Sequence, residues 1–169
     1  MQKKRFKIIA AIMMALVVTV CAAGCAAPVV NKPQMTAGAT AVKVTGSCTT
    51  EVNGDTITVK GETDIMDGAV LNISVVSQDG MIVDKVNVTK QGDSISQEFK
   101  ITSDKYDDTI KQVTGYIACA PSLYGAQPKE VIDAYGSKFE NVQAPDGDIV
   151  WNNNGVVIVF GSESVKLAK

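Results

Sequence analysis

The sequence predicts an all-β protein: an antiparallel β-sandwich with one short helix, preceded by an N-terminal signal or anchor helix. Apolar and polar residues alternate from Val42 to Val52, as in a strand with one buried face. With this run included, seven or eight such short runs stand at regular spacing, with Gly-containing turns between them. A cationic start and an unbroken apolar run stand before all of them, which is the layout of an export signal.

The first strand and its return form a hairpin. Cys48 lies on the apolar face of the strand that begins at Val42. Asn53-Gly54-Asp55 then turns the chain, because Asn-Gly tolerates the positive φ angles of a tight hairpin. Thr56–Lys60 returns with its apolar residues on the inner face.

The later strands repeat this alternation. They are expected at Ala69–Ser77, Met81–Thr89, Ser94–Ile101, Ile110–Ala120, Ile149–Trp151 and Val156–Phe160. Asp84 stands where the alternation of its strand expects an apolar residue, which predicts a bulge or a sheet edge there. The last run is apolar on both faces, as expected of a central strand that is covered on both sides.

Pro128–Tyr135 is the predicted helix. Pro128 suits the first helical turn, Val131 and Tyr135 repeat at i and i+4, and Gly136 can adopt the left-handed conformation that ends a helix. The helix is short, so we expect it to pack over one end of the sheets.

The pattern of strands from Thr56 through Phe99 to the strand around Tyr116 is similar to that of bacterial immunoglobulin-like domains. The Cys–Trp–Cys spacing of antibody domains is absent, because Trp151 follows both Cys48 and Cys119. The resemblance therefore implies an architecture and no particular ligand.

The N-terminal segment carries a second resemblance. Ala22-Ala23-Gly24-Cys25 resembles the lipobox of bacterial lipoproteins, whose cysteine thiol receives a diacylglyceryl group before the signal is cleaved in front of it. Ala22 departs from the pattern, in which Leu is usual at that position. The resemblance implies lipidation of Cys25 and this division of the chain: a signal peptide at 1–24, a lipidated N-terminus and flexible linker at 25–41, and the sandwich at 42–169.

Two other interpretations of this segment stay open. The uncharged run from Ile8 to Ala27 is about as long as the 20 residues that span a bilayer, so it also fits an uncleaved anchor. Cleavage after Ala23 would instead release the protein. In all three cases the cationic start stays inside, so the domain faces the extracytoplasmic side of the cell membrane.

Cys48 and Cys119 are the two cysteines that remain if Cys21 leaves with the signal and Cys25 is acylated. Both lie on predicted inner faces, and an even pair in an exported domain predicts a disulfide. Such a bridge would stabilise the domain by roughly 4 kcal/mol in the entropy model. The alternative is a pair of buried thiols.

Charge and composition exclude several classes of function. Removing residues 1–24 leaves 12 Lys and Arg against 18 Asp and Glu, a net charge of −6, which argues against nucleic acid as a partner. The chain has no histidine, which excludes Ser-His-Asp and Cys-His catalysis and imidazole-ligated metals. We expect no cofactor and no resident metal.

Two aromatic residues are candidates for binding. Tyr124 lies in a predicted loop and Trp151 beside a turn, so their rings can stack on a sugar or pack on a protein. The acidic groups at 104–108 and 146–148 could offer oxygen ligands to calcium, but solvated turn carboxylates are the favoured interpretation.

The sequence therefore predicts a membrane-anchored binding module that is not an enzyme. The lipid on Cys25 would hold it at the membrane, and its partner would be an extracellular protein or glycan. Two alternatives remain: a small glycan-acting enzyme that uses two carboxylates, and a structural accessory subunit.

Overall fold

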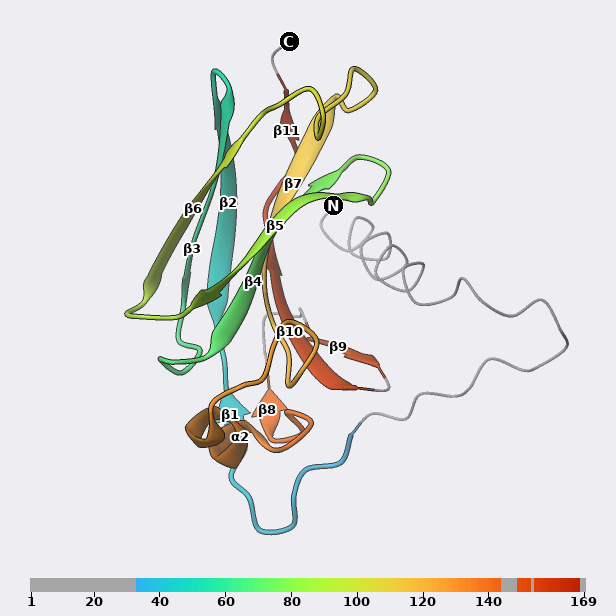
Figure 1. Cartoon of the computed structure of the whole chain (residues 1–169). Helices are drawn as coiled ribbons and strands as arrows, with labels where there is room; N and C mark the ends of the chain where they lie inside the picture. Colours follow the sequence, from blue (N-terminus) through green and yellow to red (C-terminus); the bar gives the residue numbers. More distant parts are fainter. Residues whose placement is uncertain (1–32, 144–148, 153, 168–169) are drawn as a thin grey trace, which may run out of the picture. The chain divides into compact units, whose positions relative to one another are not determined.

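The computed structural model of the chain describes residues 33–143, 149–152 and 154–167 (Figure 1). Cys25 and the expected signal or anchor helix lie outside these ranges. The described part is mostly β-structure with one short helix, α2 (Lys129–Tyr135). Its strands are β1 (Val42–Lys43), β2 (Gly46–Asn53), β3 (Thr56–Thr63), β4 (Val70–Ser77), β5 (Ile82–Thr89), β6 (Ser94–Lys100), β7 (Gln112–Cys119), β8 (Val142–Gln143), β9 (Ile149–Asn152), β10 (Gly155–Gly161) and β11 (Val165–Lys166).

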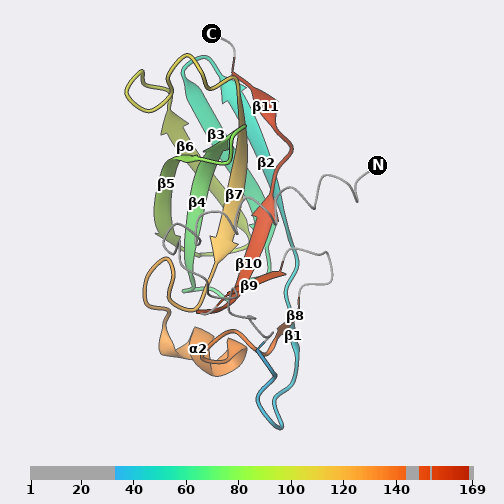
Figure 2. The ribbon, with the colours of Figure 1, turned by 90° about the vertical axis from the view of Figure 1, so that its right-hand side faces the viewer.

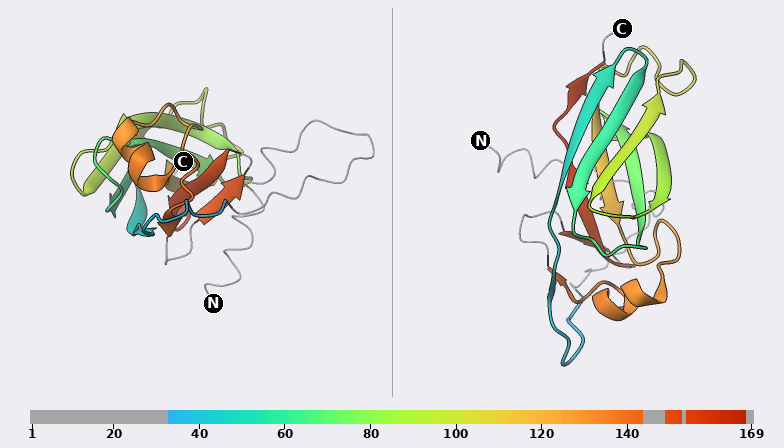
Figure 3. Two further views of the ribbon diagram at one scale, coloured as in Figure 1. Left: turned by 90° about the horizontal axis from the view of Figure 1, so that it is seen from below. Right: turned by 90° about the vertical axis from the view of Figure 1, so that its left-hand side faces the viewer.

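The strands form two antiparallel sheets that face each other (Figures 2 and 3). The small sheet has the order β2-β3-β6, and the large sheet has the order β5-β4-β7-β10-β9, with β11 pairing with β7 beyond the end of β10. β1 and β8 form a separate parallel pair. The prediction of an antiparallel, mostly β fold is confirmed.

The single strand expected from Val42 to Val52 is divided into β1 and β2, because β1 pairs with β8 and only β2 pairs with β3. The hairpin of β2 and β3 follows the predicted pattern. Exposed and half-buried residues alternate through all eight positions of β2. Gly54 has a φ of 59°, the left-handed value that the Asn-Gly turn requires. Ile57 and Val59 of β3 are fully buried, as expected.

β5 is an edge strand with a bulge, as the position of Asp84 predicts. The pairing of β4 with β5 shifts in register between Val75 and Val76, opposite Asp84 and Ile82. The Asp84 carboxylate accepts a hydrogen bond from Lys105 Nζ at 2.8 Å. An inward-leaning charge and a bulge both hinder the addition of a further strand at this edge.

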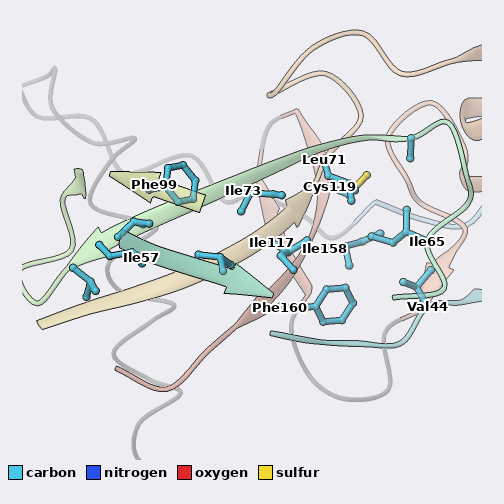
Figure 4. Close-up of a cluster of buried hydrophobic side chains, with 14 of the residues drawn as sticks. Val44, Ile57, Ile65, Leu71, Ile73, Phe99, Ile117, Cys119, Ile158 and Phe160 are labelled. Carbon is cyan, nitrogen blue, oxygen red and sulfur yellow. The ribbon is translucent and has the colours of Figure 1, made fainter. Parts of the chain in front are cut away.

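The core lies between the two sheets (Figure 4). It draws side chains from both sheets and from the helix end of the domain, among them Val44, Ile57, Leu71, Ile73, Phe99, Ile117, Ile158 and Phe160. β10 is buried on both faces, since every residue from Val156 to Phe160 is at most 5% exposed. The prediction of a covered central strand is confirmed.

α2 lies beyond one end of the sheets, as expected (Figure 1). Pro128 precedes it and Gly136, with a φ of 90°, ends it. Val131 and Tyr135 are its buried residues, and the Tyr135 hydroxyl accepts a hydrogen bond from the backbone N–H of Met66 at 2.7 Å. The helix is thus held to the loop between β3 and β4.

The folded part of the chain begins before residue 42, where the linker was expected to end. The backbone N–H of Thr36 donates to Asn141 Oδ1 at 3.0 Å, and the Thr36 hydroxyl donates to Glu140 at 3.2 Å. The backbone N–H groups of Val42 and Val44 donate to the carbonyls of Asn141 and Gln143, both at 2.8 Å. These hydrogen bonds join segments that are about a hundred residues apart in the sequence, so the local sequence pattern could not predict them.

Gly115 of β7 lies at a close contact between the two sheets. Its N–H donates to the hydroxyls of Thr50 and Ser162, each at 3.0 Å, and these two hydroxyls lie 2.7 Å apart. A Cβ at Gly115 would overlap Thr50 Oγ1 and would lie 2.8 Å from a methyl group of Val59. The site therefore has no room for a side chain.

Gly115→Ala is expected to lower the free energy of unfolding by about 1–3 kcal/mol, because the added methyl group overpacks the core. Urea unfolding followed by Trp151 fluorescence measures this loss. Adding Thr50→Ala removes the overlapping hydroxyl, so the double variant should lose less than the sum of the two single variants. Strict additivity of the two losses would show that the predicted overlap does not occur.

Candidate functional site

The two aromatic candidates are held at different edges of the large sheet. Tyr124 lies in the loop between β7 and α2, is half-buried, and accepts a hydrogen bond at its backbone carbonyl from the side chain of Asn87 on β5. Trp151 lies on β9 opposite Val156 and is 41% exposed. β5 and β9 are the two edge strands of that sheet, four strand spacings or about 19 Å apart.

Gln127 holds the loop that carries Tyr124, a role that the sequence did not suggest. Its side-chain oxygen accepts from the backbone N–H of Val70, and its side-chain nitrogen donates to the carbonyls of Val70 and Ala120, all at 2.8 Å. The amide thereby replaces the peptide group of a neighbouring strand at the start of β4. Nothing in the sequence around Gln127, which precedes Pro128 at the start of the helix, predicts this contact.

The disulfide expected between Cys48 and Cys119 is not formed, and both residues are free thiols. Cys48 Sγ lies 3.5 Å from the carbonyl of Gly115, whereas Cys119 Sγ lies 3.6 Å from the carbonyl of Val70. Gly115 and Cys119 are four residues apart on β7, or about 13 Å along an extended strand. The alternation of side chains predicts the face of the sheet on which a cysteine lies. It does not predict which residue of the facing sheet lies opposite that cysteine.

Neither thiol is prepared for nucleophilic chemistry. Burial raises the pKa of Cys48 and the pKa of Cys119 from 9.0 to about 12. A thiolate is the reactive form of cysteine, and these environments disfavour it. Both side chains act as small apolar groups of the core.

The acidic candidates serve as turn residues. Asp107 accepts hydrogen bonds from the backbone N–H and the hydroxyl of Thr109. The described residues include no group of three or more acidic, cysteine or histidine side chains placed to hold a metal ion. Asp146 and Asp148 lie outside the described ranges.

Several carboxyl groups are held in their charged form. Hydrogen bonds from Lys100, Lys90 and Thr102 lower the pKa values of Asp55, Asp67 and Asp104 respectively. A general acid at neutral pH needs the opposite shift. These three groups therefore stabilise turns and do not resemble the proton donor of a glycosidase.

The domain has two distinct ends (Figures 1 and 2). The helix end carries α2 and the first described residues. Met66, whose backbone N–H bonds to Tyr135 of α2, and Leu123, in the segment between β7 and α2, have exposed side chains. The far end carries the turns after β2 and β4 and the loop between β6 and β7, and there Met81 is 66% exposed.

Gln78 ties two loops of the far end together. Its side-chain nitrogen donates to the carbonyl of Thr109 at 3.0 Å, and its side-chain oxygen accepts from the backbone N–H groups of Lys111 and Gln112 at 3.0 and 3.1 Å. The turn after β4 and the loop before β7 thus form one continuous, ordered surface.

Comparison with models of known protein families, with curated proteins and with solved structures found no match. Within the described ranges, no helix is long and apolar enough to cross a membrane.

Proposed function

We propose that the protein is an extracytoplasmic lipoprotein in which a lipid on Cys25 holds an immunoglobulin-like β-sandwich at the cell membrane as a binding module. The N-terminal sequence supports the tether through its cationic start, its apolar run and the small residues before Cys25. The ligand class is an extracellular protein or glycan.

The position at which the chain enters the fold is the observation that carries this proposal. Thr36 is bound to Asn141 and Glu140 at the helix end, only eleven positions after Cys25 in the sequence. A lipid on Cys25 would therefore keep the helix end close to the membrane. The far end, with the surface that Gln78 orders, would point away from it and toward partners.

The order of the strands supports the finer description of the fold. In immunoglobulin-like domains, the first, second and fifth strands share one sheet, and the third, sixth and seventh share the other. If β2 is counted as the first strand, the small sheet β2-β3-β6 holds the first, second and fifth, and the large sheet contains β4-β7-β10 as the third, sixth and seventh. The fourth strand, β5, pairs with β4 in the large sheet, whereas the fourth strand of a constant-type domain lies in the other sheet. The free thiols and the position of Trp151 differ from antibody domains, whose core disulfide packs on a tryptophan.

The intact mass of the protein recovered from native membranes tests the tether. The expected mass is that of a chain beginning at Cys25 plus a diacylglyceryl group. A Cys25→Ala variant should lose both the lipid and its partition with membranes, while Cys48→Ala serves as the matched control and should keep both. The full-chain mass in the wild type would instead mean an uncleaved anchor and would overturn the proposal.

The binding role needs its own measurement. Hydrogen exchange of the membrane-held protein, with and without the extracellular fraction of the same cells, should slow in backbone amides of the far-end loops. Unchanged exchange at the far end, with slowing confined to the helix end, would contradict the proposed presentation.

A further inference from the structure

β6 is a long and regular strand at the open edge of the small sheet. All seven of its residues from Ser94 to Lys100 pair with β3, with no shift in register. No strand follows it in the order β2-β3-β6 of the described chain, and Figure 3 shows it at the outer side of that sheet. An edge of this kind presents unpaired backbone groups that can join another strand.

The other described edges are hindered. β5 has a bulge and the charged side chain of Asp84, and β9 is only four residues long. β2, the opposite edge of the small sheet, lies close to β10 and β11, and its Thr50 hydroxyl is 2.7 Å from that of Ser162 in the segment between them. β6 has neither proline, nor bulge, nor a charge pointing inward, since its inner residues are Ile95, Gln97 and Phe99.

The hydrogen bonds at the ends of β6 show which backbone groups face outward. Asp93 and Ile101, just before and just after the strand, bond to the backbone of Thr63 and Asp55 on the β3 side. In an antiparallel pair such bonding residues alternate, so the odd-numbered residues of β6 face β3. The outward N–H and C=O groups belong to Ser94, Ser96, Glu98 and Lys100.

One contact agrees with this assignment. The side chain of Gln97 donates to the carbonyl of Glu98 at 2.8 Å. This carbonyl faces outward, and a side chain of the same strand satisfies it in place of a neighbouring strand.

We infer that β6 pairs antiparallel with β6 of a second copy of the chain, with the two-fold axis at Gln97. In this register the outward-facing residues form hydrogen-bonded pairs, Ser94 with Lys100 and Ser96 with Glu98. On the inner face, half-buried Ile95 meets Phe99 of the partner copy. The strand is thus complementary to itself, which a two-fold interface requires.

The neighbouring registers are less suitable. An axis at Glu98 would place two glutamates directly opposite each other, which destabilises a strand pair. An axis at Ser96 would pair Ile95 with Gln97 and would leave Phe99 and Lys100 without partners. Only the axis at Gln97 uses all seven residues of β6.

Charge substitutions at the two-fold axis test the pairing. The full-length chain in detergent micelles is studied by light scattering, corrected for detergent, over a range of concentrations. The wild type is expected to approach twice the monomer mass. Gln97→Lys and Gln97→Glu should each stay monomeric, because like charges then lie opposite each other. An equal mixture of the two variants should regain the doubled mass.

A control variant distinguishes loss of this interface from a general effect of added charge. Ser47→Lys adds the same charge on the exposed face of the same sheet, opposite Glu62, and should leave the doubled mass unchanged. The unfolding midpoint of each variant shows that it is folded. A monomeric wild type, a dimeric Gln97→Lys variant or a monomeric mixture of folded variants would each overturn the inference. Because lipidation of Cys25 plays no part in these masses, the outcome is independent of the proposed tether.

Discussion

The free energy of unfolding is expected to fall by about 3 kcal/mol between pH 8 and pH 10, because two thiols are buried in the folded chain. Cys48 and Cys119 keep their protons up to a pKa of about 12 when folded, but lose them near 9.0 when unfolded. The unfolded state therefore binds fewer protons above pH 9, and stability falls as the pH rises. Each thiol contributes about 1.4 kcal/mol over this interval.

Urea unfolding at several pH values measures this decline. A variant with Cys48→Ala and Cys119→Ala should be less stable at pH 8, but its stability should fall much less than that of the wild type up to pH 10. Its remaining decline, about 1 kcal/mol at most, comes from Tyr106, Tyr124 and Tyr135, because burial raises their pKa values above the ordinary value of 10.0. A wild type that declines no more than this variant would mean that the thiols are oxidised or solvated, since a disulfide has no proton to lose.

Phe139→Ala is expected to lower the free energy of unfolding by about 3–5 kcal/mol. The Phe139 side chain is fully buried, and its ring meets that of Tyr135 edge to face, with centroids 5.2 Å apart and planes at 84°. Truncation removes this contact and leaves a cavity between α2 and the sheets. Thermal and urea unfolding measure the loss.

Conservative variants at the same contact show how large the loss of stability in Phe139→Ala is by comparison. Tyr135→Phe keeps both rings and removes only the hydrogen bond from Met66, so it should cost about 1 kcal/mol. The loss in the free energy of unfolding for Phe139→Leu should lie between those for Tyr135→Phe and Phe139→Ala. If Phe139→Ala cost no more than Tyr135→Phe, the helix would contribute little to the core.

The strands and their faces were predictable, because each depends on neighbours within a few residues. The alternation in β2, the turn at Gly54 and the irregularity at Asp84 were all confirmed. The helix was predicted at Pro128–Tyr135 and lies at Lys129–Tyr135, a difference of one residue.

A buried lysine shows what such patterns miss. The Lys90 side chain is 3% exposed and its ammonium group lies 2.8 Å from the Asp67 carboxylate. In the sequence, Lys90 stands beside a Gln-Gly-Asp turn, where a lysine is expected to be solvated. Its burial results from the loop between β3 and β4, which packs beside it in the folded chain and whose position no local pattern specifies.

Periodicity in the sequence specified the longer strands, the turns and the helix and which side chains face inward, since backbone periodicity is a local property. Contacts between distant segments fixed which strands are neighbours and in what register they pair. Such contacts also formed the short strands β1, β8 and β11, which the local pattern did not predict as separate strands. Cys48 and Cys119 thus share the core without forming a disulfide, and the backbone of Tyr124 is bound to one edge strand of the large sheet while Trp151 lies on the other. The unhindered edge at β6 likewise became evident only from the order of the strands.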